Sequence, residues 1–246
     1  MSIETEAGAP EVRVKRPPRE EVARGVKDSL AAGLGMVPLG VAFGLLVVQA
    51  GLPWWIAPAL SVAAFAGSVE LLLIGMIAAA VPLATIALTT FLVNFRHVFY
   101  AFSFPLHVVG NRAARAYSVY ALIDEAYAVT AASRERWTGW RLVSMQLSFQ
   151  VYWVAGGLAG VALASALPGT IKGLEFALCA LFVTLTLDAA RSKGQVPSLL
   201  LAALSFAVAV VAAPDAILFV ALLLFTALLF VRHLVTARRF RSVSDA

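Results

Sequence analysis

An arginine, an asparagine and a histidine stand inside an apolar run that is long enough to cross a bilayer. They are Arg96, Asn94 and His97, and the run covers residues 89–103. An arginine at the centre of a membrane costs about 2.5–3.5 kcal/mol on insertion scales, so it usually marks a substrate path, an ion path or a buried pair. An arginine can hold a carboxylate bidentately, and a histidine can relay a proton near neutral pH. These residues predict a site for a charged ligand within the membrane.

The polar residues of this run share one helical face. At about 100° per residue they fall within about half of the circumference, and most of the phenylalanines lie on the other half. The polar set is Thr89, Thr90, Asn94, Arg96, His97, Tyr100 and Ser103. Such a helix can turn its aromatic side to lipid or packed helices and its polar side to an interior lined by protein.

One isolated acid precedes this run. Glu70 is the only charged residue between Ser29 and Phe95, and it follows Gly67 and Ser68. A carboxyl at this depth could bind a substrate ammonium group or exchange a proton during transport. The alternative is a structural ion pair between Glu70 and the arginine of the polar run.

Two adjacent acids, Asp124 and Glu125, lie in a shorter apolar stretch. Neighbouring residues point to different sides of a helix, so at most one of them is expected to share a site with Arg96. The alternative for both is an interfacial position without a chemical role.

Taken together, these residues predict the binding of a zwitterion, which needs a cationic and an anionic subsite. We expect Arg96 to hold a carboxylate and Glu70 or Asp124 to hold an ammonium group or to exchange a proton, with Phe65, Ala66 and Gly67 lining a side-chain pocket. The candidate substrate-binding residues are Arg96, Asn94, Glu70, Ser68, Gly67 and Tyr100. The candidate proton-coupling residues are Glu70, Asp124, Glu125 and His97.

The first apolar segment carries helix-breaking residues in its middle. Pro38 removes a backbone hydrogen bond, and Gly35 and Gly40 permit close helix approach or local unwinding. One interpretation is a broken helix at the substrate site, and the other is a kinked packing helix.

The composition predicts an all-α polytopic membrane protein. Of the 246 residues, 61% are hydrophobic and 13% are charged, whereas a soluble domain is nearer half apolar and a quarter charged. We expect basic, cytoplasmic tails over 1–28 and 234–246, the first of them disordered, and a transmembrane domain over 29–233. The apolar segments are roughly 29–50, 54–80, 82–105, 117–132, 141–166, 174–190, 196–213 and 215–233.

The number of full crossings is six to eight. Eight crossings put Arg112 and Arg115 outside, against the preference for basic residues on the cytoplasmic side. Six crossings, with 54–80 and 117–132 re-entrant, put them inside, and both counts leave the two termini in the cytoplasm. A faint similarity between residues 44–53 and 160–168 suggests an internal repeat, which is common in transporters.

Other classes of protein find little support in the sequence. The net charge of +5 comes from basic residues in tails and short loops rather than from a nucleic-acid-binding motif or stripe. The enzyme motifs H-E-x-x-H and G-x-S-x-G are absent, and we expect neither a cofactor nor a metal. The main alternative to a transporter is an ion or small-anion channel in which Arg96 confers selectivity.

Four motifs resemble the azaleucine-resistance (AzlC) family of branched-chain amino acid permeases. They lie at residues 65–70, 90–100, 123–127 and 173–177, and the second matches in residue type, spacing and position. The chain differs from the usual family pattern at Glu70, where glutamine is frequent, and at Glu175, where aspartate is frequent.

The resemblance implies a secondary transporter in the bacterial cell (inner) membrane. It implies export of valine, leucine, isoleucine and sometimes methionine, together with a small hydrophobic AzlD-like subunit. Combined with the buried acids, it predicts proton antiport of branched-chain or related neutral amino acids.

Overall fold

The computed structural model describes residues 17–167, 196–214 and 217–244, together with Phe176, Cys179 and Val183. These parts form helices and contain no strand, and the protein is an all-α membrane protein. Within them, three helical stretches are long and apolar enough to cross a membrane. They are Pro18–Gln49, Leu83–Tyr100 and Gly139–Ala166.

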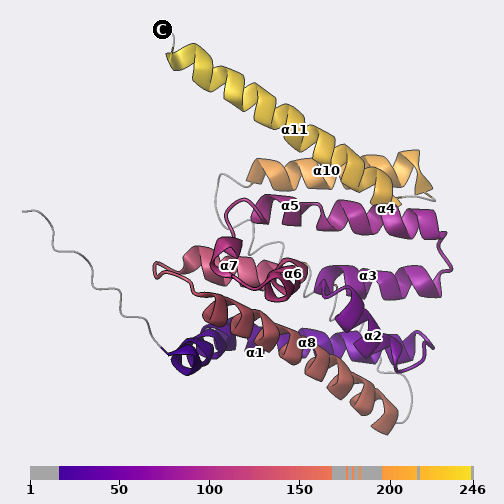
Figure 1. The fold of residues 1–246 in the computed structure, drawn as a ribbon. Coiled ribbons are helices and arrows are strands. Elements are labelled where there is room, and N and C mark those ends of the chain that lie inside the picture. The colour runs from indigo at the N-terminus through magenta and orange to yellow at the C-terminus, as the bar shows by residue number, and fades with distance from the viewer. Residues whose placement is uncertain are drawn as a thin grey trace, which may run out of the picture.

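The helices stack in layers (Figure 1). The helices α1 and α8 lie side by side, α3 packs between α1 and α4, and α10 and α11 pack on each other next to α4. The elements in chain order are α1 (Pro18–Gln49), α2 (Ile56–Ala63), α3 (Gly67–Ala78), α4 (Leu83–Asn94), α5 (Arg96–Tyr100), η1 (Leu106–Val108), α6 (Arg112–Tyr120), α7 (Asp124–Ala132), α8 (Gly139–Ala166), α10 (Val196–Ala212) and α11 (Ile217–Ser244).

The first helix differs from expectation at both its start and its middle. It begins at Pro18, with Glu20 and Glu21 in its first turn, where proline and acidic residues are favoured. The predicted disorder of residues 18–28 is therefore wrong, while residues 1–16 lie outside the described part. The helix also continues through Pro38, so the break predicted at Gly35, Pro38 and Gly40 is not there.

The breaks occur in other segments. The predicted segment 54–80 consists of α2 and α3, which are separated at residues 64–66, and 82–105 is interrupted at Phe95, after α4. The segment 117–132 falls on α6 and α7. A straight span needs about 20 residues, so neither half of 54–80 can cross a bilayer alone. The predicted segment 174–190 lies outside the described residues, apart from the three named above.

A contact near the start of α8 bears on the topology. The carbonyl oxygen of Val108 lies 2.8 Å from the place where a Cβ on Gly139 would be, and the side chain of Arg115 donates to the carbonyl of Val109 at 3.0 Å. Arg112 and Arg115 thus lie at the same end of the molecule as the loop that leads into α8. This placement is the one expected if the segment 117–132 does not cross the membrane.

Glycines bring the backbones of α1 and α8 together. A Cβ on Gly40 would lie 2.9 Å from the carbonyl oxygen of Trp153, and a Cβ on Gly156 would lie 2.8 Å from that of Val37. Gly44 and Gly160 repeat the same reciprocal arrangement one turn further on. Two G-x-x-x-G faces therefore meet in a parallel pair, as in membrane helix dimers.

The symmetry of this contact supports an internal repeat. Each of the four glycines faces the carbonyl oxygen of the residue three positions before the glycine that opposes it on the other helix. Gly44 and Gly160 are also the first residues of the two similar stretches, 44–53 and 160–168. The sequence similarity and the reciprocal packing therefore identify the same pair of positions.

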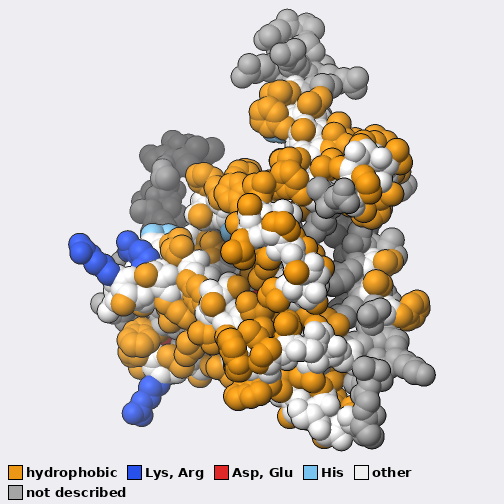
Figure 2. Space-filling model, turned by 90° about the vertical axis from the view of Figure 1, so that its right-hand side faces the viewer, with side chains coloured by type: hydrophobic (Ala, Val, Ile, Leu, Met, Phe, Trp, Pro, Cys, Tyr) orange, Lys and Arg blue, Asp and Glu red, His pale blue; other side chains and the backbone are white. Residues whose placement is uncertain are grey.

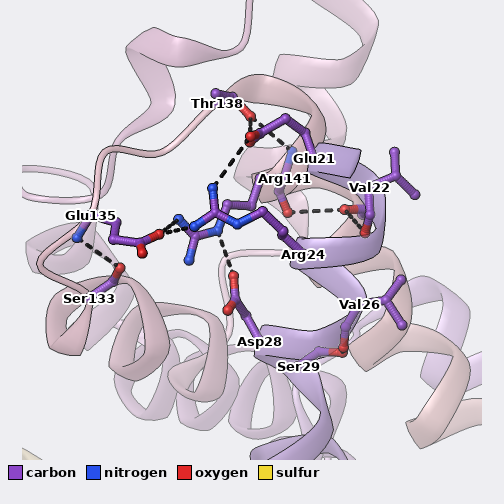
Figure 3. Close-up of polar contacts among 11 residues, drawn as sticks. Glu21, Val22, Arg24, Val26, Asp28, Ser29, Ser133, Glu135, Thr138 and Arg141 are labelled. Carbon is purple, nitrogen blue, oxygen red and sulfur yellow. Dashed lines mark hydrogen bonds and ion pairs between the residues drawn. The ribbon is translucent and has the colours of Figure 1, made fainter. Parts of the chain in front are cut away.

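An ionic cluster joins α1 to the start of α8 (Figure 3). The buried Arg141 donates to Asp28 at 2.6 Å and to Glu135 at 3.0 Å, and its guanidinium lies 4.3 Å from the centre of the Trp137 ring. Arg24 also pairs with Glu135. The cluster fixes the loop between α7 and α8 against the beginning of α1.

The outer surface suits a bilayer. Hydrophobic side chains cover most of the face in Figure 2, and Lys and Arg side chains project at one edge. On α4 and the following turn, Phe91, Phe99 and Phe102 are all more than half exposed. These side chains form the aromatic side that the sequence predicts for this run.

We expect Gly40→Ala to destabilise the protein by about 1–3 kcal/mol, because the added methyl group meets backbone atoms of α8. Gly35→Ala is the matched control on the same helix. A Cβ there has no neighbour within 4 Å, so this change should be neutral or stabilise by up to about 1 kcal/mol. Unfolding in detergent micelles measures both variants, and equal effects would refute the close-packing account.

The ionic cluster predicts a pH-dependent contribution to stability. Arg24 first, with Arg141 adding to its effect, lowers the pKa of the Glu135 carboxyl, and desolvation partly opposes them. A lowered folded-state pKa stabilises the protein above the unfolded-state pKa, and this contribution disappears as the pH falls through the folded-state pKa.

Glu135→Gln should therefore be less stable than the wild type at neutral pH, and the two should converge in acid. Thermal unfolding of both proteins over a series of pH values measures the difference. A gap that stays constant across the series would contradict a role for the Glu135 charge.

Candidate functional site

A pocket lies where three helices begin. The first residues of α3, α5 and α7 are Gly67, Arg96 and Asp124, and all three line this pocket. Its empty volume is about 730 Å³, including its open mouth. Non-helical backbone at membrane depth is tolerated where it is buried in protein or lines a cavity, and the turns before α3 and α7 meet that condition. Phe95, between α4 and α5, keeps helical φ and ψ angles.

The polar side of the pocket contains both signs of charge. Its polar side chains are Ser68, Arg96, His97, Asp124 and Glu125. Arg96 Nη2 lies 2.7 Å from Asp124 Oδ2 and also donates to Ser68 Oγ at 3.2 Å. The two charged side chains are 43% and 42% exposed, so a ligand can reach both of them.

Tyr100 supports this ion pair from outside the pocket. Its hydroxyl donates to Asp124 Oδ1 at 2.9 Å, so both carboxylate oxygens of Asp124 have partners. The ring of Tyr100 stacks on Tyr127 with a centroid distance of 4.1 Å. The structure therefore places Tyr100 behind Asp124 rather than in the pocket lining.

The start of α3 adds backbone donors. The first N–H groups of a helix have no partner within the helix and carry partial positive charge. Those of Gly67 and Ser68 belong to the first turn of α3, and both residues line the pocket. Together with Arg96 they make one side of the pocket attractive to an anion.

The turn before α3 is strained. Phe65 has a φ of 42°, in the left-handed region that residues other than glycine rarely adopt. Its side chain is buried and lines the pocket. The strained turn places the first residues of α3 at the pocket wall.

The pocket also has an apolar wall. It consists of Met36, Leu39, Phe65, Leu71, Ile123 and Trp153. Trp153 stacks on Phe43 with a centroid distance of 5.8 Å. Its ring also lies 3.0 Å from the place of a Cβ on Gly67, so a side chain at that position would displace the ring.

Glu70 lies outside the pocket lining, although it is close in sequence to Gly67 and Ser68. Its side chain is fully buried and accepts hydrogen bonds from Ser61 Oγ, Ala66 N and Trp153 Nε1, each at 2.9 Å. The alternative that the sequence left open, an ion pair between Glu70 and Arg96, is not formed, because Arg96 pairs with Asp124 instead.

A second pocket adjoins the first. It is lined by Asn94 and Tyr120, among others, and it shares Phe65, Ala66 and His97 with the first pocket. Asn94 Oδ1 is buried there and has no hydrogen-bond partner in the described part of the chain. His97 Nδ1 lies 2.9 Å from the Asn94 carbonyl oxygen. These three shared residues partition the two pockets.

The structure brings together most of the residues that the sequence singled out. Arg96, Ser68, Gly67, His97 and both adjacent acids line one pocket, so the expectation that at most one acid shares a site with Arg96 is wrong. Both acids reach the pocket because they are the first two residues of α7, and the pocket lies at this end of the helix. Asn94 lines the second pocket instead.

Sequence reasoning missed Trp153, Met36 and Leu39. One signal for the first was available, because a buried indole N–H needs an acceptor. An apolar helix that contains a tryptophan therefore calls for a polar partner, and here that partner is Glu70. The other two residues carry no polar signal in the sequence.

The fold and the site define a helical membrane protein with a charged and partly apolar pocket between interrupted helices. The family model described as AzlC protein matches residues 31–167, more than half of the chain, and the chain belongs to this family. The matched region includes every residue that lines the first pocket.

Several relatives are similar to part of this chain. An uncharacterized membrane protein of Haemophilus influenzae is 27% identical over 61% of this chain and 64% of its own length. The branched-chain amino acid transport protein AzlC of Bacillus subtilis is 26% identical over 63% of this chain and 62% of its own. Inner membrane protein YgaZ of Escherichia coli is 29% identical over 69% and 73%. The chain thus spans less than two thirds of the first two, and no solved structure matches it significantly.

Proposed function

We propose that this protein is a secondary transporter that exports branched-chain or related neutral amino acids, such as valine, leucine, isoleucine and methionine, by proton antiport. The observation that carries the proposal is one pocket that combines a cationic group, anionic groups and apolar side chains. A neutral amino acid presents the same three features. The name of the Bacillus subtilis relative, a branched-chain amino acid transport protein, supports this substrate class.

Each part of the substrate has a candidate partner. Arg96 and the first N–H groups of α3 hold the carboxylate, and Asp124 and Glu125 hold the ammonium group. The aliphatic side chain packs on Trp153 and the other apolar wall residues. Such a wall discriminates by only about 1–3 kcal/mol per methylene, so we propose overlapping substrates rather than a single one.

Proton exchange falls to the titratable groups that line the pocket. Asp124, Glu125 and His97 lie there, and His97 also reaches the second pocket. A substrate that moves between the two pockets passes Phe65, Ala66 and His97, which belong to both. We propose this partition as the place where access alternates.

The orientation follows from the basic residues. Arg19, Arg24 and Lys27 lie on the first turns of α1, which the ionic cluster ties to the loop that contains Arg134 and Arg136. Basic residues favour the cytoplasmic side. We propose that this end faces the cytoplasm of a bacterial cell with the protein in the inner membrane, and that both termini lie inside.

Replacement of Arg96 tests the site. Arg96→Ala should reduce efflux of labelled leucine from preloaded cells by at least about 100-fold, because the carboxylate loses its cationic partner. Arg112→Ala is the matched control, since Arg112 is an exposed arginine outside the pocket. Both variants should insert normally. Normal flux through the Arg96 variant would remove this residue from the site, and ionic current without leucine flux would favour a channel.

Co-expression tests the proposed small AzlD-like membrane subunit. The chain alone in proteoliposomes should release leucine poorly, and addition of the small subunit should restore saturable release that responds to a pH gradient. The exposed aromatic side of α4 is compatible with a helical partner. Full activity of the chain alone would refute dependence on a partner.

A further inference from the structure

We infer that Glu70 is a positioning residue that holds the indole of Trp153 at the pocket wall and thereby limits the size of the substrate side chain. The inference rests on the proposed function, because it concerns the apolar wall of the same pocket. It assigns a purpose to the one fully buried carboxyl group in the described part of the chain.

The contacts of Glu70 leave little room for a direct role. Oε1 accepts from Ala66 N, and Oε2 accepts from both Ser61 Oγ and Trp153 Nε1. The pocket lining includes residues on both sides of Glu70 in the sequence but not Glu70 itself. To bind an ammonium group, the carboxyl would have to give up these bonds and rotate out of its buried site.

One carboxyl group therefore joins four parts of the fold. Ser61 is on α2, Ala66 is in the break, Glu70 is on α3 and Trp153 is on α8. The bond to Ala66 also fixes the residue that precedes the first turn of α3. Through these bonds the broken segment is attached to the helix that forms the core with α1.

The Trp153 ring is held from three directions. Its N–H is bonded to Glu70, one face stacks on Phe43, and its far edge packs where Gly67 has no side chain. The same ring lines the pocket. Loss of the acceptor would leave a buried N–H unpaired, which is unfavourable, so the ring would turn toward another acceptor and the wall would move.

Size selectivity is the property to measure. Phenylalanine and leucine would each compete against efflux of labelled leucine in cells that contain the chain and its small partner, and the ratio of half-inhibitory concentrations would be recorded. Glu70→Leu has a similar size but no acceptor oxygen for the Trp153 N–H, and it should shift the ratio toward phenylalanine by about tenfold. Trp153→Phe lacks the N–H and has a smaller ring, so it should shift the ratio in the same direction.

The double variant and a control sharpen the test. Glu70→Leu combined with Trp153→Phe should shift the ratio no more than Trp153→Phe alone, since both changes act through one contact. Ser61→Ala is the matched control, because it removes a donor to the same oxygen and leaves the bond to Trp153 in place. Its ratio should equal that of the wild type.

Other results would contradict either the role of Glu70 or the proposed function. Unchanged ratios in inserted variants, with leucine flux in the wild type, would overturn this inference alone. A changed pH profile with an unchanged ratio in Glu70→Leu would make Glu70 a coupling acid instead. If Glu70→Leu does not insert, Glu70→Ala takes its place in the same comparison, because a shift in Trp153→Phe alone follows from its smaller ring. Absence of amino-acid flux from the inserted wild-type complex would overturn the proposed function as well.

Discussion

The close approach of α1 and α8 is the constraint on which the rest of the structure depends. Glycines at Gly40, Gly44, Gly156 and Gly160 let the two backbones touch, and in lipid such packing replaces the hydrophobic driving force that is missing between helices. The contact fixes where Trp153 lies along α1, because its carbonyl oxygen faces Gly40, and its ring lines the pocket. The core pair and the pocket wall are therefore one unit.

Against this rigid pair, the interrupted helices provide the chemistry. A continuous helix satisfies its own backbone and offers a ligand only side chains, whereas a helix that begins at membrane depth also exposes N–H groups. Two such beginnings, at Gly67 and Asp124, meet Arg96 at one pocket. The strain at Phe65 and the buried bonds of Glu70 accompany this arrangement, because the broken segment needs attachments that a continuous helix would not.

Local sequence was sufficient for the charged part of the site. Arg96, Asp124 and Ser68 stand out because polar residues at membrane depth are costly, and the structure brings them together. The packing of the α1 glycines and the role of Glu70 could not be predicted in the same way. Both depend on α8, more than eighty positions away in sequence, which packs against the glycines of α1 and supplies the indole for Glu70. Signals within one segment cannot identify such partners.

The ion pair between Arg96 and Asp124 reduces the cost of holding both charges in the pocket. Each charge neutralises the other at a separation of 2.7 Å. A zwitterion that enters between them replaces one internal pair by two pairs with the ligand, so the net charge of the site does not change. The cost of separating the two residues is then offset by contacts of the same kind. An ion of a single sign would leave one of the two residues without a partner, which favours a zwitterion over a simple ion as the ligand.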